Sequence, residues 1–413
     1  MRKTRTWWVT ASTVLFAVVL SACGSDSKST ATSETTAGTP SSAASTSAAP
    51  SSEAPSTAAP SSAAPSTEAL STAAPSADDV QARVAKYKIE PTSILVTTPL
   101  KSKPDPGKTF VYLQCEASSC KVEADALKAA TSAIGWDLKI YNYEQSNPAT
   151  LISAMEQALT LNPKPVAVAF DGLPEALWAA EVPKFKDAQI AILPSYLGPT
   201  PIEFPVLTNI GGSTDVASYG EILADWVAAD SGGKGKVLLQ SVNDFPILKV
   251  FSDTFRKTLT SNCPGCSVTE VNNTLAQVGG GEVASTLISG LQKDPTLNYV
   301  VGCNGLFLNG LPSALAAAGL TGKVKVAAES ANATNLTDLQ TGKADAFVGI
   351  PLGYGAWLWI DAILRYLQGL PFDPANGGLP KQLLTKEVPF VVSDSYDKPA
   401  DYQEHFKKLW LVA

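Results

Sequence analysis

The cysteines in the second half of the chain are the residues whose spacing most directly suggests chemistry. Cys263-Pro264-Gly265-Cys266 has the two-residue spacing of thiol redox centres. Redox activity of that type requires the first cysteine to begin a helix, where the helix dipole lowers the pKa of its thiol. Here the pair follows the end of a helical pattern and precedes a strand pattern, SVTEV. We therefore expect Cys263 and Cys266 to form a structural disulfide rather than a catalytic centre.

Carboxylates offer a second kind of chemistry. Glu116, Asp171 and Glu329 each follow a strand-like run, and a facing pair of carboxylates is the arrangement used for glycoside hydrolysis. The residue types alone do not separate such a pair from ligand contacts or solvated loop acids. The lone histidine, His405, offers one imidazole at most for a histidine-based metal centre or a Ser–His–Asp triad. We expect no catalytic residue, no metal and no cofactor.

The composition indicates an acidic chain with enough apolar residues for a large core. Its 413 residues are 45% hydrophobic and 17% charged, and the formal net charge is −7. A chain of this length allows two or three domains of roughly 100–200 residues each. It has no basic excess to neutralise phosphates, so a nucleic-acid partner is not expected.

The first 23 residues have the organisation of an export signal. Basic residues at 2–5 precede an apolar stretch, 7–20, that is short for a membrane-spanning helix of about 20 apolar residues. Leu20-Ser21-Ala22-Cys23 then resembles the lipobox of bacterial lipoproteins, in which the peptide is cleaved before the cysteine and the cysteine is acylated. We expect residues 1–23 to be a lipoprotein signal peptide and Cys23 to carry the lipid. An ordinary cleaved signal or an uncleaved anchor is the alternative.

Residues 24–78 are almost entirely Ser, Ala, Thr and Pro, with repeated Ala-Ala-Pro-Ser units and a single large aliphatic residue, Leu70. Such a segment cannot bury enough apolar surface to offset the entropy of ordering it, so we expect it to be disordered. Its prolines favour extended geometry, which makes it a semi-stiff spacer. The segment is therefore interpreted as a tether between a membrane surface and a folded module.

Export also bears on the remaining cysteines, because an exported chain meets an oxidising environment. Cys115 and Cys120 flank one short loop and are expected to pair and close it. Cys303 is left over, and we expect a buried thiol at that position.

The folded part alternates between strand-like and helix-like segments, a pattern typical of parallel β-α-β units. An N-terminal extension, 79–106, begins with a helix-like segment and continues as an extended stretch. Strands are expected at 109–114, 138–143, 165–170, 189–194, 236–240, 267–271, 299–302, 324–328, 346–350 and 387–392. Helices are expected at 121–134, after Asn147, and at 173–187, 213–229, 247–260, 282–292, 310–318, 335–341 and 353–368.

These elements form two doubly wound α/β sets of similar size. The apolar helix expected at 353–368 has no strand partner in the second set, so the economical arrangement returns it to the first. We expect an α/β fold of two Rossmann-like lobes, 107–210 plus 351–383 and 211–350 plus 384–413, joined by a hinge of several crossovers. A cleft then lies between the carboxyl ends of the two sheets, where open α/β sheets bind ligands.

Residues 107–393 resemble a type I periplasmic-binding-protein fold of the sugar ABC-transporter branch. The resemblance rests on an ordered series of segments: GKTFVYLQC, AIGWDL, NPATLISAMEQAL, AVAFDG, IGGSTDVASYGEILADWVA, VVGCNGLFLNGLPSALAAAGL, VAAES and LQTGKADAFVGIP. It implies a monomeric, non-enzymatic protein that captures a small polar ligand outside the cytoplasm and delivers it to an ABC permease. The lipid anchor would retain it at the membrane of a cell without an outer membrane, as in actinobacteria.

The resemblance also implies where ligand contacts lie, because family contacts come from loops at strand ends. Sugar binders often have stacking aromatics in the first loop and an Asp-Arg pair after the fourth strand; this chain has Ser119-Cys120 and Pro194-Ser195 instead. Most of the residues with which a pentose or hexose binder contacts its sugar are thus absent. This indicates a changed ligand, which is either sugar-like or another polar metabolite. The expected contacts are Glu116, Ser118, Asp171, Ser195, Tyr196, Phe245, Asn304, Glu329, Ser330 and Tyr354.

Two other functions remain open on the same scaffold. The module would serve as a ligand sensor if its partner were a membrane signalling receptor. The less favoured alternative is a cell-surface enzyme, which would convert the compound that it binds.

Overall fold

The computed structural model describes residues 75–372 and 378–413. The expected signal peptide, the cysteine expected to be acylated, Cys23, and the expected tether up to residue 74 lie outside the described residues. Within the described ranges, no helix is both long enough and apolar enough to cross a membrane.

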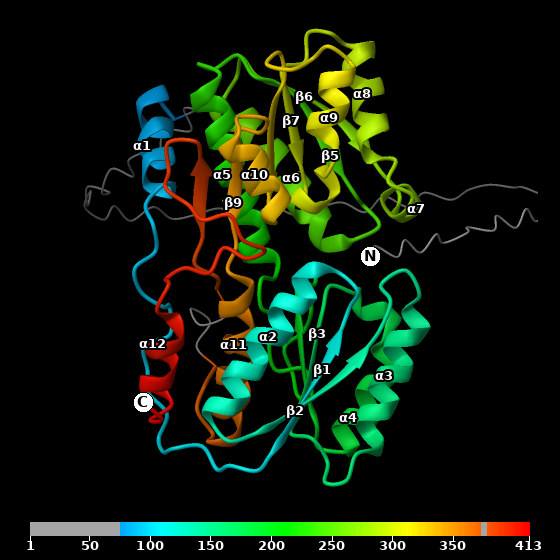
Figure 1. Cartoon of the computed structure of the whole chain (residues 1–413), viewed down its shortest axis with the longest axis vertical. Coiled ribbons are helices and arrows are strands. Elements are labelled where there is room, and N and C mark those ends of the chain that lie inside the picture. Colours follow the sequence, from blue (N-terminus) through cyan, green and yellow to red (C-terminus); the bar gives the residue numbers. More distant parts are fainter. Residues whose placement is uncertain (1–74, 373–377) are drawn as a thin grey trace, which may run out of the picture. The chain divides into compact units, whose positions relative to one another are not determined.

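The first lobe is built on a parallel four-stranded sheet with the order β2-β1-β3-β4. Phe110 to Leu113 of β1 and all residues of β3 are buried, as in parallel sheets that are covered on both faces. Figure 1 shows α2 and α11 on one face of this sheet and α3 and α4 on the other. The elements are β1 (Thr109–Gln114), α2 (Ser118–Ala133), β2 (Asp137–Asn142), α3 (Pro148–Thr160), β3 (Ala167–Asp171), α4 (Val182–Asp187), β4 (Ala191–Ser195) and α11 (Leu352–Leu367).

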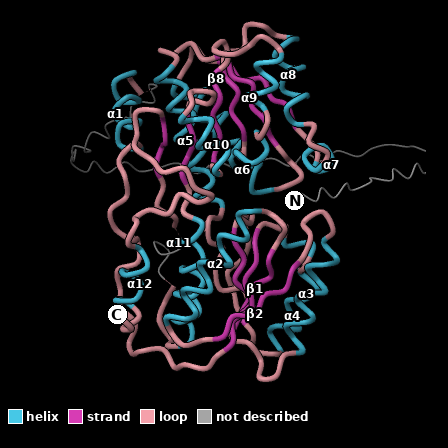
Figure 2. Tube along the Cα trace, in the orientation of Figure 1, coloured by secondary structure: helices cyan, strands magenta, loops and turns pink. Residues whose placement is uncertain are grey.

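The second lobe is built on a six-stranded sheet with the order β10-β9-β8-β7-β5-β6, in which β10 alone runs antiparallel to its neighbour. The tube view in Figure 2 shows helices on both sides of these strands. The elements are α1 (Ala77–Tyr87), α5 (Ser213–Asp230), β5 (Lys236–Ser241), α6 (Pro246–Asn262), β6 (Ser267–Asn272), α7 (Leu275–Gly279), α8 (Val283–Lys293), β7 (Tyr299–Gly302), α9 (Leu311–Ala317), β8 (Lys325–Glu329), α10 (Ala333–Gln340), β9 (Ala346–Gly349) and β10 (Gln382–Thr385).

Two segments depart from the expected boundaries at the N-terminal side. Helix α1 begins at Ala77, with Ser76 as its cap, so the last residues assigned to the tether belong to the folded part. The helix expected at 173–187 is interrupted: short 3₁₀ turns precede α4, which begins at Val182. Pro183 explains this start, because proline is tolerated in the first turn of a helix but not in its interior.

The C-terminal region departs further. A strand expected at 387–392 is absent from the described structure, and the chain instead pairs β10 with β9. Pro389 explains the difference, since it cannot donate a ladder hydrogen bond. Residues 402–413, expected in the second lobe, lie on the first: α12 (Tyr402–Leu409) packs on α11, and Trp410 stacks on Trp357 with ring centroids 5.0 Å apart. Figure 1 shows α12 beside α11.

A buried ion pair fastens this C-terminal segment. Arg365 Nε lies 2.6 Å from Asp361 Oδ2, and both side chains are essentially inaccessible to solvent. The indole N–H of Trp410 donates to Asp361 Oδ1 at 2.9 Å, and Arg365 donates to the carbonyl of Thr98 at 2.6 Å. Helix α11 is therefore tied both to the residue that follows α12 and to the segment that leads into β1.

Candidate functional site

A cavity of about 150 Å³ lies between the carboxyl ends of the two sheets. Every strand-end loop that lines it follows a parallel strand, which is where open α/β sheets place ligands. The first lobe contributes Ala117, Ser119, Gln145, Asp171, Gly172 and Tyr196; the second contributes Val216, Phe245, Ile247, Leu248, Asn304, Leu306, Phe307, Glu329 and Ser330; Ile350 and Leu352 lie between them.

Six of the residues expected from the sequence line this cavity together: Asp171, Tyr196, Phe245, Asn304, Glu329 and Ser330. Four others, Glu116, Ser118, Ser195 and Tyr354, are not among the described lining residues. Sequence reasoning did not single out Gln145, Phe307 or Val216, which do line it. Gln145 had a usable signal, because it follows β2 and so stands at the same sheet edge.

Tyr354 was expected to contact the ligand, but it lies in the protein core. Its side chain is fully buried, and its hydroxyl accepts the backbone N–H of Leu95 at 3.0 Å. Its ring packs on Phe406 and Tyr402 of α12, with centroid distances of 5.3 and 5.9 Å. Tyr354 therefore belongs to the core between α11 and α12.

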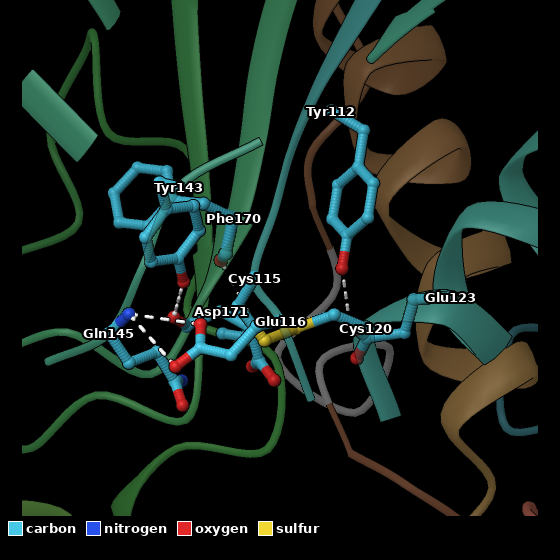
Figure 3. Close-up of a disulfide and its surroundings, with 10 residues drawn as sticks. Tyr112, Cys115, Glu116, Cys120, Glu123, Tyr143, Gln145, Phe170 and Asp171 are labelled. Atoms are coloured by element: carbon cyan, nitrogen blue, oxygen red, sulfur yellow. Dashed lines mark hydrogen bonds between the residues drawn. A yellow bond between two sulfur atoms is a disulfide. The ribbon is translucent and has the colours of Figure 1, made fainter. Parts of the chain in front are cut away.

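The expected disulfide between Cys115 and Cys120 is present and closes the loop after β1 (Figure 3). Inside this loop, Glu116 accepts the backbone N–H of Gln145 at 3.0 Å and so connects the first loop to the second. Ser118 is the first residue of α2 and Ser119 lines the cavity. Glu116 thus contacts the wall of the cavity rather than its interior.

Asp171 ends β3 and is buried beside the disulfide loop (Figure 3). It accepts a hydrogen bond from the hydroxyl of Ser195, and its backbone carbonyl accepts one from Tyr143 at 2.6 Å. Burial raises the pKa of the Asp171 carboxyl to about 6, against the opposing effect of the Ser195 hydrogen bond. Ser195 therefore does not line the cavity itself but orients the carboxylate of Asp171 through this hydrogen bond.

Glu123 of α2 is a second buried carboxyl in the first lobe. Tyr112 donates its hydroxyl to Glu123 at 2.6 Å, and burial together with the charge of Asp171 raises the pKa of Glu123 well above its ordinary value. Cys120, Glu123 and Asp171 place three potential metal-ligand atoms within 4.8 Å of one another. The sulfur of Cys120 is engaged in the disulfide and cannot act as a thiolate ligand, so only two of the three ligand atoms remain.

Glu329 ends β8 in the second lobe and faces the cavity. It is 4% exposed, and its carboxylate accepts no hydrogen bond from any residue that the structure describes. Burial raises its pKa to about 8. Asn304, which follows β7, caps the next turn by accepting the N–H of Leu306 at 2.9 Å, so its amide NH₂ group remains available to the cavity.

Residues 121–371 match the family model described as the periplasmic binding protein domain. The chain belongs to this family. The match spans more than half of the chain, confirms the resemblance drawn from its segments, and places it among binding proteins rather than enzymes, as expected. No curated protein is significantly similar in sequence.

Solved structures share the fold of this periplasmic binding protein. An ABC sugar transporter subunit from Rhodobacter sphaeroides is 21% identical with a TM-score of 0.58, covering 68% of this chain and 99% of its own. An ABC transporter solute-binding protein from Agrobacterium vitis, bound to α-D-tagatopyranose, is 20% identical with a TM-score of 0.60, covering 71% and 100%. A 5-methylthioribose transporter solute-binding protein from Thermotoga lettingae is 16% identical with a TM-score of 0.58, covering 76% and 100%. The expected two-lobed α/β fold is confirmed.

The second expected disulfide of the binding protein, Cys263–Cys266, is also present. It joins the end of α6 to the start of β6, at the opposite end of the second sheet from the cavity. Cys303 is a buried free thiol, as expected, with its sulfur 3.4 Å from Gln240 Oε1. The Cys-Pro-Gly-Cys motif therefore closes a turn.

Tyr196 approaches the backbone at the point where the chain leaves the first lobe. Gly211 has φ of +65°, and a Cβ there would lie 2.3 Å from the ring of Tyr196. Only glycine accommodates both the left-handed backbone and this contact. The ring that lines the cavity is thus held against the crossover between the lobes.

The double substitution Cys115→Ser with Cys120→Ser is expected to weaken ligand binding. Opening a loop of this length costs about 2 kcal/mol of stability on the loop-closure model, and the freed loop loses more entropy on binding. Calorimetric titration with the natural ligand measures the affinity. Cys263→Ser with Cys266→Ser is the matched control, because its disulfide lies away from the cavity. Equal affinity for wild type and the first double variant would contradict the functional role of the loop.

Proposed function

We propose that the protein is an extracytoplasmic, lipid-anchored solute-binding protein that captures a small polar ligand between its lobes and delivers it to an ABC-type permease. The observation that carries this proposal is a cavity lined by both lobes, with Asp171 and Gln145 on one side and Asn304 and Glu329 on the other. A ligand that contacts both sides favours a closed conformation, in which the two lobes approach each other. A permease can recognise that closed conformation.

The comparisons support a small, ring-sized ligand. Structural relatives are described as carrying α-D-tagatopyranose or 5-methylthioribose. A cavity of about 150 Å³ is also the size that holds a single six-membered ring in other proteins. A sugar or a similarly sized polar metabolite would therefore fit.

The chain connections support a hinge. The chain crosses between the lobes after α1, near Gly211, at residues 350–351, between α11 and β10, and between β10 and α12. These crossings lie beside the cavity at Gly211 and Ile350. Several crossings that lie together permit rotation of one lobe against the other.

Small molecules released from denatured, freshly purified protein should include one dominant polar species by mass spectrometry. Added back to ligand-free protein, that species is expected to bind and to reduce the radius of gyration in small-angle scattering, because it joins the two sides of the cavity. Saturating ligand without compaction would contradict delivery by lobe closure. Chemical conversion of the ligand would favour an enzyme instead.

The lipid anchor has a separate test. Cys23→Ala is expected to release the exported protein from the membrane fraction, since acyl chains anchor a protein by burying methylene groups at about 0.8 kcal/mol each. Fractionation of cells that express wild type or the variant measures this. Ser21→Ala keeps a small residue before the cysteine and should leave the protein in the membrane fraction. Failure of labelled palmitate to enter the wild-type protein would overturn the anchor.

A further inference from the structure

We propose that the cavity binds a small organic cation, with its protonated amine held between Asp171 of the first lobe and Glu329 of the second. This inference rests on the proposed solute-binding function and names the chemical class of the ligand.

The charge of the cavity is the first argument. Its charged lining residues are Asp171 and Glu329, and no lysine, arginine or histidine lines it among the residues that the structure describes. Both carboxyls are buried, at 8% and 4% exposure. A buried carboxylate is stabilised by a cation or by several hydrogen-bond donors, and without them burial favours the protonated, neutral carboxyl. A protonated amine supplies both the charge and three donors.

The surroundings of Glu329 give the second argument, because no described residue forms an ion pair or a hydrogen bond with its carboxylate. Tyr196, Tyr219 and Cys303 are the titratable groups on neighbouring elements, and none of them carries positive charge. Lys381 lies 5.2 Å from the ring centroid of Tyr219, and its ammonium group is paired with Asp215 at 2.7 Å. Glu329 thus faces the ligand space with a carboxylate that has no hydrogen-bond partner among the described residues.

The described residues around Asp171 include no cation either. Glu123, Tyr112 and Tyr143 are the titratable groups packed around it in the first lobe. Among the described residues, only Ser195 donates a hydrogen bond to its carboxylate. Each lobe therefore presents an acid without a basic counterpart, and a cation between them would draw the lobes together.

The rest of the lining fits the body of such a ligand. Tyr196, Phe245 and Phe307 offer aromatic faces, which attract cations and pack against apolar groups. Gln145 and Asn304 offer amides for hydroxyl groups. An amino sugar or a compact amine with an apolar face combines these features at the size of the cavity.

The raised pKa values of the two acids predict how binding depends on pH. Asp171 with a pKa of about 6 and Glu329 with a pKa of about 8 bind protons that an amine must displace. Affinity for an amine should therefore rise as the pH increases through this range, until the amine itself loses its proton. A neutral sugar releases no such protons and should not show this rise.

Matched probe pairs test the proposal by calorimetric titration of ligand-free protein. The pairs are D-glucosamine with D-glucose, D-galactosamine with D-galactose, and cyclohexylamine with cyclohexanol. At least one amine is expected to bind about tenfold or more tightly than its hydroxyl partner at pH 7.5, as a charge-assisted hydrogen bond would give. Its affinity should rise between pH 5.5 and pH 8, with proton release visible in buffers of different ionisation enthalpy.

Substitutions locate the effect. Glu329→Gln and Asp171→Asn are each expected to weaken binding of the amine by about tenfold or more, and to weaken it more than binding of the matched neutral probe. Glu282→Gln, which removes one exposed carboxylate, is the charge-matched control and should change neither. Thermal unfolding of each variant checks that it is folded.

The outcomes separate this inference from the proposed function. The inference is overturned, and the solute-binding function stands, if neutral sugars bind as tightly as the amines and also compact the protein. The same holds if Glu329→Gln binds amines with wild-type affinity. If no amine binds, the inference is also overturned. If, in addition, the purified protein releases no small molecule, both proposals fail.

Discussion

Replacing Asp361 by alanine is expected to lower the free energy of unfolding by about 3–5 kcal/mol. The substitution leaves the guanidinium of Arg365 buried without its counter-ion, and it removes the acceptor of the Trp410 indole N–H. Removal of one partner of a buried ion pair costs more than the pair contributes, because the remaining charge stays out of water. Urea unfolding followed by tryptophan fluorescence measures the loss.

Two further variants make this expectation specific. Asp125→Ala removes the acid of an exposed ion pair with the same four-residue helical spacing, Lys121–Asp125, and is expected to cost about 0.5 kcal/mol or less. Asp361→Leu combined with Arg365→Met removes both charges and should recover much of the loss, since apolar residues can replace a buried pair. A loss below about 1 kcal/mol in Asp361→Ala would mean that solvent reaches Arg365.

The fold could largely be predicted from the sequence because its central strands are buried on both faces. Runs such as 109–114 contain apolar residues at successive positions, a signal that does not depend on distant contacts. The return of α11 to the first lobe was also predictable, because this helix had no strand to follow in the second set. Its packing on α2 confirms that expectation.

Apart from Pro389, which argues locally against a strand at 387–392, the C-terminal region could not be predicted from local pattern because distant contacts determine it. The run at 387–392 is rich in β-branched residues, yet the shorter run at 382–385 pairs with β9. Helix α12 is short, and its position is set by Trp410 against Trp357 and by the buried Asp361. Neither contact can be inferred from a window of neighbouring residues.

Part of the candidate site could likewise be predicted from the sequence, whereas the position of Tyr354 could not. Asp171 ends a strand of the first sheet, and Asn304 and Glu329 stand at strand ends of the second, so topology alone brings them to the carboxyl edges of the two sheets. Tyr354 was misplaced because it stands on a helix, where two residues correspond to about 200° of rotation. Leu352 faces the cavity and Tyr354 therefore faces α12. The phase of a helix start was not readable from the sequence.

Glu329→Gln is expected to stabilise the ligand-free protein increasingly as the pH rises. The pKa of Glu329 is raised from 4.5 to about 8 in the folded protein, so between these values the folded state binds a proton that the unfolded state has lost. Wild-type stability should fall as the pH increases through this window, by at most about 1.4 kcal/mol per pH unit. Asp171, whose pKa is raised from 3.8 to about 6, adds a similar fall at lower pH.

The difference between variant and wild type isolates Glu329, because every other group titrates in both proteins. From pH 5 to pH 8 this difference should grow by on the order of 3 kcal/mol, measured by urea unfolding across the range. Glu282→Gln, at an exposed site, should run parallel to wild type. Parallel curves for Glu329→Gln would show that the carboxyl ionises without penalty and does not need a partner. The stability difference between Glu329→Gln and wild type should grow with pH in the ligand-free protein. If it disappears when an amine is added, the amine stabilises the ionised carboxylate of Glu329.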